Sequence, residues 1–410
     1  MKNKMNKRFI YLSTSCTKSR FYELQHQGIN RDVPQAQKYH RLLIEGLSKN
    51  KDTKVDAITL IPTNREWCRK LFFGRDEECV SENLKYIYVP FINFPIVKQI
   101  LLKQTIKKEL LKEIKAHQSE EIYIVCDIWN QTLSECAKSI GRKAGIKVIG
   151  IVTDVPKHRS DAYKSSKMSI KSIVKDYVEN RTYKNASKYD YYLLLTRAMN
   201  DVVNPKHMPF VVLEGHCDLN MRNTSNDLNQ KSYPKVMLYA GTLHREYGIE
   251  LLINAFLEGK YEDWEFHIYG QGNYEKRIKQ ICKDHSQIKY FGLVDNSHII
   301  NAQVKATLIV NPRPTIDDYV KYSFPSKTLE AMASGTPLLS TKLPGIPEDY
   351  YEYIYLFDEE SINGFKTALD HILHIDKETL HDKGAIAKEF AISQKNNCVQ
   401  AKKIIDMVSL

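Results

Sequence analysis

The 410-residue sequence lacks any apolar run that approaches the roughly 20 residues of a membrane-spanning helix. Its N-terminus is basic, but the apolar stretch Phe9-Ile-Tyr-Leu12 is too short for the core of a signal peptide. We therefore expect a cytoplasmic protein. The eight cysteines are scattered and include no C-x-x-C pair, so neither a zinc site nor a redox pair is indicated.

Clusters with metal-ligand spacing are also missing from the sequence. No D-x-D carboxylate pair occurs in a suitable context, and the adjacent Asp317 and Asp318 fall in an expected loop. This absence predicts chemistry that requires no metal ion.

Positive charge is concentrated in the first half of the chain. Residues 1–214 hold 38 Lys+Arg and 23 Asp+Glu, a net charge of +15, whereas the remainder holds 22 and 26, a net charge of −4. Such asymmetry suggests that the first half meets nucleic acid, an anionic membrane surface or a phosphate-bearing substrate. A lysine-rich composition without any such partner is the alternative.

Strand and helix patterns alternate along the chain, which predicts parallel sheets covered on both faces. In an N-terminal domain of residues 1–215 we expect strands at 9–15, 55–61, 85–89, 121–127, 147–153, 189–196 and 209–214, and helices at 35–48, 94–115 and 131–144. Polar residues 216–234 read as a linker. In a C-terminal domain of residues 235–385 we expect strands at 236–240, 264–269, 288–291, 306–310, 336–341 and 353–357, and helices at 249–257, 274–284 and 325–334.

The predicted fold class is α/β, with two Rossmann-like doubly wound parallel-sheet domains that face each other across a cleft. Residues 386–410 are expected to form a C-terminal helix that packs back on the N-terminal domain. Ligands of such sheets bind at the carboxyl ends of the strands.

The segment from Tyr322 to Thr341 predicts a loop, a short helix closed by Gly335, and a buried strand. Lys327 stands in the first turn of this helix, where a cation opposes the helix dipole. An anion bound to the free N–H groups of the helix would explain that placement. A lysine that reaches solvent and pairs with Glu330 is the alternative.

Glycines follow several predicted strands of the second half, namely Gly241, Gly270 with Gly272, and Gly292. Glycine lets the backbone approach a ligand closely, although it also simply ends strands. Glu330, one turn into the helix, has the chemistry to accept ribose hydroxyls, and a surface glutamate is the alternative.

The second half resembles the nucleotide-sugar domain of family 4 glycosyltransferases of the GT-B fold. The resemblance rests on Gly241-Thr, on Tyr247-Gly-Ile-Glu-Leu-Leu-Ile-Asn-Ala-Phe256, on Ile268-Tyr-Gly-Gln-Gly272 and on Phe324-Pro-Ser-Lys-Thr-Leu-Glu-Ala-Met-Ala-Ser-Gly-Thr-Pro337. More loosely, Gly150-Ile-Val-Thr-Asp-Val-Pro156 and Tyr192-Leu-Leu-Leu-Thr-Arg-Ala-Met199 resemble bacterial polysaccharide-assembly members. The resemblance implies a nucleotide-sugar donor in the second domain, an acceptor in the first, and retention at the anomeric carbon.

Residue by residue, the resemblance implies that Glu330 binds ribose. Tyr322 stands where the family has a glutamate that meets the donor sugar, and Thr242 and Tyr247 replace its diphosphate-binding arginine and lysine. Lys327 is therefore the main candidate for charge compensation of the diphosphate, with Arg245 or Arg313 as additional cations. The full predicted donor site is Gly241, Thr242, Arg245, Gly270, Gly272, Tyr322, Ser323, Ser326, Lys327 and Glu330.

The family's catalytic histidine of the first domain would fall near Thr153 and Asp154. Asp154 is a candidate for positioning or deprotonating the acceptor hydroxyl, and a cap on the following turn is the alternative. Three further candidates for binding the acceptor or the diphosphate are Arg20, Lys38 and His40. The alternative is that each is an ordinary surface residue.

Residues 157–188 are basic and interleaved with apolar side chains, which favours contact with an anionic membrane surface or a helix packed on its own domain. The expected function is transfer of a sugar from a UDP- or GDP-sugar to a lipid-linked or polysaccharide acceptor, without any cofactor. A sugar-nucleotide epimerase, a catalytically inactive partner subunit and a nucleic-acid-binding or scaffold protein are the alternatives. No nucleic-acid-binding module is apparent.

Overall fold

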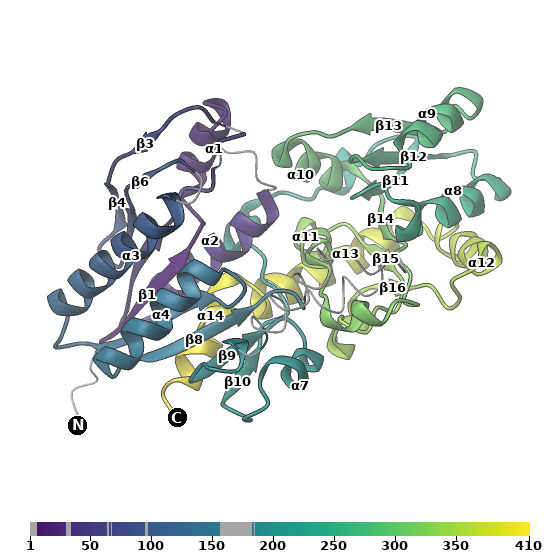
Figure 1. The fold of residues 1–410 in the computed structure, drawn as a ribbon. Helices are drawn as coiled ribbons and strands as arrows, with labels where there is room; N and C mark the ends of the chain where they lie inside the picture. The colour runs from purple at the N-terminus through teal and green to yellow at the C-terminus, as the bar shows by residue number, and fades with distance from the viewer. Residues whose placement is uncertain are drawn as a thin grey trace, which may run out of the picture. The chain divides into compact units, whose positions relative to one another are not determined.

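The structure is a computed structural model that describes residues 6–29, 34–63, 65–66, 68–94, 97–155, 183 and 185–410. The chain divides into two compact units (Figure 1): unit 1 comprises residues up to His216 together with Asn397–Leu410, and unit 2 comprises Cys217–Asn396. Residues 217–234, expected as a linker, thus belong to unit 2. The reason is that Leu219 and Met221, two apolar residues within this polar stretch, pack against its core.

Unit 1 is built on an eight-stranded sheet with the order β10-β9-β8-β7-β1-β2-β5-β4. All neighbouring strands are parallel except β4 and β5, which pair antiparallel. The strands are β1 Lys7–Ser13, β2 Thr53–Thr59, β4 Asp76–Ser81, β5 Leu84–Tyr88, β7 Glu121–Asp127, β8 Lys147–Val152, β9 Tyr191–Leu194 and β10 Phe210–Val212; β3 Phe72–Phe73 and β6 Phe91–Ile92 form a separate pair.

The helices of unit 1 cover this sheet. They are α1 Lys18–His26, α2 Pro34–Ser48, α3 Val97–Ala116, α4 Gln131–Ala144, α7 Asn200–Val203 and α14 Asn397–Met407, with the 3-10 turn η1 Arg197–Met199. Helix α3 packs beside α4, and α2 packs beside α14. The side-chain amide of Asn397 donates to the Leu42 carbonyl at 3.0 Å, which ties the C-terminal helix to α2.

Unit 2 contains a six-stranded, all-parallel sheet with the order β13-β12-β11-β14-β15-β16. Its strands are β11 Lys235–Ala240, β12 Trp264–Tyr269, β13 Ile288–Gly292, β14 Leu308–Asn311, β15 Leu338–Ser340 and β16 Tyr355–Leu356. The helices are α8 Ile249–Glu258, α9 Glu275–Asp284, α10 Asn296–Lys305, α11 Ser326–Ser334, α12 Ile362–Ile372 and α13 Lys377–Gln394, and the 3-10 turns are η2 Leu219–Asn223, η3 Leu228–Gln230, η4 Arg245–Tyr247, η5 Asp318–Tyr322 and η6 Glu348–Tyr353.

Strand β11 shows why unit 2 has helices on both faces. Met237 and Tyr239 join a core with residues of α8, α9 and α12, whereas Val236 and Leu238 join a second core with residues of α11 and α13. Successive side chains of a strand point to opposite faces, so an apolar strand requires two covering layers. The predicted α/β fold class, with doubly wound Rossmann-like domains, is confirmed.

Candidate functional site

The order of strands in unit 2 places a switch point between β11 and β14. From β11 the chain runs outward through β12 and β13, and from β14 it runs outward the other way through β15 and β16. In an open parallel sheet the crevice at the carboxyl ends of two such strands is where ligands bind. Gly241 directly follows β11, and Pro312 and Arg313 directly follow β14.

The predicted glycines meet at this edge of the sheet. The Gly270 N–H donates to the Gly292 carbonyl at 2.8 Å. A Cβ on Gly270 would lie 1.8 Å from the Gly241 carbonyl oxygen, and its φ of +127° is strained for any other residue. A Cβ on Gly272 would lie 2.2 Å from the Leu243 carbonyl oxygen. Close approach of these turns to one another therefore already requires Gly270 and Gly272, whatever ligand the edge binds.

Lys327, the second residue of α11, reaches the switch point. Its Nζ donates to the carbonyl of Ala240, the last residue of β11, and would lie 3.1 Å from a Cβ on Gly241. Burial lowers the pKa of Lys327 to about 8, and the nearby Glu330 carboxylate opposes that shift. A desolvated ammonium group at a sheet edge of this kind is electrostatically poised for an anion.

The first turn of α11 adds to this environment. Pro325 occupies the N-cap position, and no side chain caps the helix. The buried Thr328 Oγ1 has no hydrogen-bond partner among the residues that the structure describes. Uncapped N–H groups and the positive end of the helix dipole favour negative charge.

The other predicted residues of this segment differ in their exposure. Ser326 is exposed at the start of α11, and Glu330 is partly buried. Tyr322 is buried in η5, with the Lys321 ammonium 5.3 Å from its ring centroid. The Ser323 hydroxyl accepts a hydrogen bond of 3.5 Å from Nη1 of Arg313.

Two predicted residues of the loop after β11, Thr242 and Arg245, make hydrogen bonds with other residues of unit 2. Arg245 donates from Nε to the Glu250 carboxylate, and its side chain is 71% exposed. Thr242 is exposed, and its carbonyl accepts a hydrogen bond from the Tyr239 hydroxyl at 2.9 Å. In the structure Arg245 is thus engaged in an exposed ion pair, and such pairs contribute little to stability.

The prediction did not include Tyr239. Its hydroxyl would lie 2.5 Å from a Cβ on Gly241, so it borders the same point as the Lys327 ammonium. The sequence signal is weak, since Tyr239 reads as one more residue of an apolar strand. Its place next to the last residue of β11 is the feature that brings it to the sheet edge.

In unit 1, Asp154 follows β8. Its Oδ1 accepts a hydrogen bond from the Val155 N–H at 2.7 Å, and its carbonyl accepts one from Trp129 Nε1 at 2.6 Å. A catalytic role of the Asp154 carboxylate stays a prediction. The turn that Asp154 would cap begins outside the described residues, so the turn-capping reading also stays a prediction.

His40 is buried, so the reading of it as a surface residue is wrong. Its Nδ1 lies 2.8 Å from the Tyr11 hydroxyl, and its Nε2 lies 3.7 Å from Asp127 Oδ2. β1 and β7 flank the switch point of the unit 1 sheet, and α2 brings His40 there.

Arg20 pairs with Asp76, and Lys38 is partly buried. Most of the basic stretch 157–188 lies outside the described residues.

Comparison with known proteins agrees with this architecture. Residues 220–390 match the family model described as glycosyl transferases group 1. Residues 220–390 thus form a glycosyl transferases group 1 domain, and the fold of the chain is that of GT-B glycosyltransferases. Among curated proteins the comparison found no match.

Three solved structures resemble the glycosyltransferase over nearly its whole length. A sucrose-phosphate synthase from Thermosynechococcus elongatus is 16% identical, with a TM-score of 0.66 and 98% of each chain covered. HepE from Anabaena, in complex with UDP and glucose, is 13% identical, with a TM-score of 0.59 and coverage of 99% of this chain and 100% of that one. The lipopolysaccharide outer core galactosyltransferase WaaB, in its apo form, is 13% identical, with a TM-score of 0.59 and coverage of 98% and 99%. At these identities the likeness shows the shared fold.

One group of possible metal ligands in the glycosyltransferase was not anticipated, because its members come from β2, from α3 and from the turn after α3. Asp56, Glu113 and His117 offer ligand atoms that all lie within 4.8 Å of one another. Asp56 Oδ2 accepts from Arg8 Nη1 at 2.6 Å, and Glu113 Oε2 accepts from Lys85 at 2.9 Å. The two cations already compensate these carboxylates, so the group reads as a buried ion-pair network.

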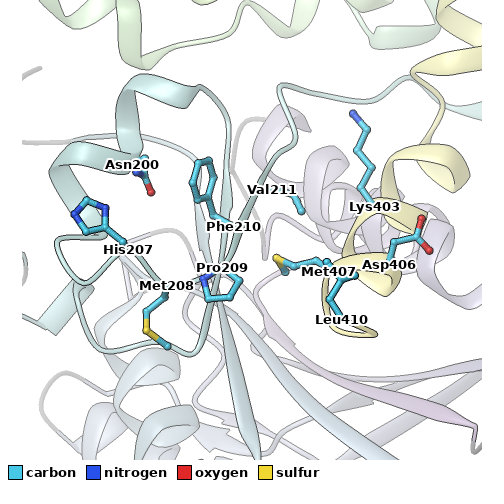
Figure 2. Close-up of a pocket in the computed structure, with 10 residues that line it drawn as sticks. All are labelled: Asn200, His207, Met208, Pro209, Phe210, Val211, Lys403, Asp406, Met407 and Leu410. Atoms are coloured by element: carbon cyan, nitrogen blue, oxygen red, sulfur yellow. The ribbon is translucent and has the colours of Figure 1, made fainter.

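Unit 1 of the glycosyltransferase also has a groove of about 560 Å³ beside the edge strand β10. Figure 2 shows Met208, Pro209 and Phe210 on one side of it, and Met407 and Leu410 of the C-terminal segment on the other. None of the predicted site residues lines this groove. Within the described ranges, no helix of the glycosyltransferase is both long and apolar enough to cross a membrane.

Proposed function

We propose that this glycosyltransferase moves a sugar from a UDP- or GDP-sugar to a lipid-linked or polysaccharide acceptor, with retention at the anomeric carbon. The observation that carries the proposal is the Lys327 ammonium at the switch point of the unit 2 sheet, beside the uncapped start of α11. A nucleoside diphosphate is the anion whose charge and size suit a helix N-terminus with an added lysine.

In the proposed reaction, the bond between the anomeric carbon and the β-phosphate oxygen breaks, and a bond from that carbon to the acceptor oxygen forms. Negative charge grows on the departing diphosphate. Lys327 and the first N–H groups of α11 stabilise that charge, because fixed cations and dipoles act most strongly where charge develops in the transition state. We assign Glu330 to the ribose, and Asp154 to the acceptor hydroxyl, whose proton it accepts.

The similar structures support a nucleotide-sugar donor. HepE was solved with UDP and glucose, and WaaB is named as a galactosyltransferase of the lipopolysaccharide outer core. The net charge of +15 on residues 1–214 supports an acceptor that carries anionic groups, such as a lipid-linked diphosphate at the inner face of the plasma membrane. In this proposal the protein is peripheral to that membrane.

The direct test is a turnover assay with UDP- and GDP-sugars, with and without a lipid-linked acceptor, in the presence of EDTA. We expect nucleotide release that depends on the acceptor, is insensitive to EDTA, and falls at least 100-fold in Lys327→Met. An isomerised nucleotide sugar formed without acceptor would instead identify an epimerase. Unchanged turnover in Lys327→Met would exclude the proposed role of Lys327.

A further inference from the structure

Arg313 lies on the β14 side of the switch point and has an unusual environment for a cation. Its guanidinium carbon is 5.5 Å from the ring centroids of both Tyr247 and Tyr319. Its Nη1 makes one long hydrogen bond of 3.5 Å, to Ser323 Oγ. No carboxylate forms an ion pair with it anywhere in the described part of the chain.

The Nε–H of Arg313 is buried and, among the described residues, has no hydrogen-bond partner. A buried donor without an acceptor is costly, and a guanidinium without a counterion adds to that cost. The planar donors of arginine match the oxygens of a phosphate, which would satisfy both the hydrogen-bonding and the charge requirement. The environment of Arg313 is therefore suited to bind an anion.

Arg313 and Lys327 both border the switch point, since Arg313 directly follows β14 and Lys327 donates to the last residue of β11. The Tyr239 hydroxyl and the Lys327 ammonium would lie 2.5 Å and 3.1 Å from a Cβ on Gly241. Burial raises the pKa of Tyr239, and the charge of Arg313 acts against that shift, so Arg313 is close enough to influence this hydroxyl. The two cations thus approach the crevice from β14 and from α11.

Tyr247 explains how Arg313 is held. The resemblance places a diphosphate-binding lysine at position 247, and here a tyrosine presents its ring to Arg313 instead. We propose that Arg313, supported on the rings of Tyr247 and Tyr319, is the second cation of the diphosphate site and compensates for the missing cation at position 247. This inference rests on the proposed function, and it assigns diphosphate binding to the residue that follows β14.

The test is a calorimetric titration of the full chain with UDP, GDP, UMP and GMP. Arg313→Met keeps the packing against both rings and removes the charge. We expect its Kd for the diphosphate that binds the wild-type protein to rise about 10- to 100-fold, and its preference for diphosphate over monophosphate to shrink. Arg277→Met, which removes an exposed arginine of α9, is the matched control and should bind like the wild type.

Arg313→Lys serves as the second variant, and it covers the case in which Arg313→Met does not fold. It retains a charge but not the planar fork, so its Kd should lie between those of the wild type and Arg313→Met. Wild-type binding in Arg313→Met or Arg313→Lys, alongside weakened binding in Lys327→Met, would overturn this inference and leave the proposed function standing. If neither UDP nor GDP binds the wild-type protein, both proposals fail.

Discussion

Replacement of Lys327 by methionine should make the unliganded protein more stable while it weakens nucleotide binding. Burial lowers the pKa of Lys327 from 10.5 to about 8. At about 1.4 kcal/mol per pH unit, the charged ammonium costs roughly 3 kcal/mol in the folded state at neutral pH. Loss of its hydrogen bond to the Ala240 carbonyl costs about 1 kcal/mol. Lys327→Met should therefore raise the free energy of unfolding by about 2 kcal/mol, which corresponds to a rise of roughly 4–8 °C in the midpoint of thermal unfolding.

The pH dependence of this effect has a definite sign. Because the folded-state pKa of Lys327 lies below its ordinary value, the destabilisation is fully present below pH 8 and vanishes as the pH rises from 8 to 10.5. The stability difference between Lys327→Met and the wild type should thus be largest near pH 7 and small at pH 10. Binding of a diphosphate requires the charged form, so wild-type affinity should fall about tenfold per pH unit above 8. Lys327→Met should lack that fall.

Urea unfolding at pH 7 and pH 10 measures the stability difference, and calorimetric titration with UDP or GDP at pH 7, 8 and 9 measures the affinity. Lys276→Met, an exposed lysine of α9, is the control and should change neither quantity. The reasoning would be refuted if Lys327→Met were less stable than the wild type at pH 7. It would also be refuted if the variant bound the nucleotide with wild-type affinity.

Three further substitutions test other parts of the structure. Gly270→Ala should destabilise unit 2 by about 3 kcal/mol in thermal unfolding, because the new Cβ would lie 1.8 Å from the Gly241 carbonyl at a strained φ. Gly46→Ala should loosen α14, since its Cβ would lie 2.1 Å from the Asn397 carbonyl, and limited proteolysis should then cut the C-terminal segment faster. Asp154→Asn retains an oxygen acceptor and should keep wild-type stability, while the transfer rate falls about 100-fold.

Gly74→Ala is the control for both glycine substitutions, because a Cβ there meets no atom within 4 Å, and it should change stability by less than about 0.5 kcal/mol. Comparable losses in Gly74→Ala and Gly270→Ala would argue against the steric explanation. Proteolysis of Gly46→Ala at the wild-type rate would argue against close packing of α14 on α2. Wild-type turnover in Asp154→Asn would argue against a catalytic role of the Asp154 carboxylate and leave its hydrogen bond with the Val155 N–H.

The elements with the strongest apolar patterns were predictable from the sequence. Helix α4 and strands β7 and β12 have the predicted bounds of residues 131–144, 121–127 and 264–269. Each shows either a continuous apolar run or a clear amphipathic repeat. A continuous run follows from burial of both faces of an element, and an amphipathic repeat follows from burial of one face. The left-handed Gly335 after α11 was likewise predictable, because few other residues adopt that conformation.

Elements with little buried surface were missed. Helix α1 buries only Phe21 and Leu24, and α10 buries only Gln303 and Val304, so neither shows a convincing helical repeat. Strand β4 is almost entirely exposed and reads as a polar loop. Propensity alone is a weak guide when packing contributes so little.

The candidate site was only partly predictable, because its chemistry depends on contacts between distant segments. Lys327 stood out for its place in the first helical turn, and the structure adds that its ammonium reaches the end of β11. That Arg245 pairs with Glu250, and that Arg313 has no such partner among the described residues, follows only from the packed loops. The burial of His40 against Tyr11 depends on the placement of α2 over β1, which no local pattern specifies.

The central claim is that unit 2 binds the diphosphate of a nucleotide sugar at the switch point between β11 and β14. A thermal unfolding series with UDP, GDP and their sugars, on the wild type and on Lys327→Met, tests it most directly. At about 100-fold over Kd, a nucleotide that binds should stabilise the wild-type protein by roughly 2.7 kcal/mol, and Lys327→Met should show little of that gain at the same concentration. An unfolding midpoint that no nucleotide moves, or that moves equally in both proteins, would contradict the claim.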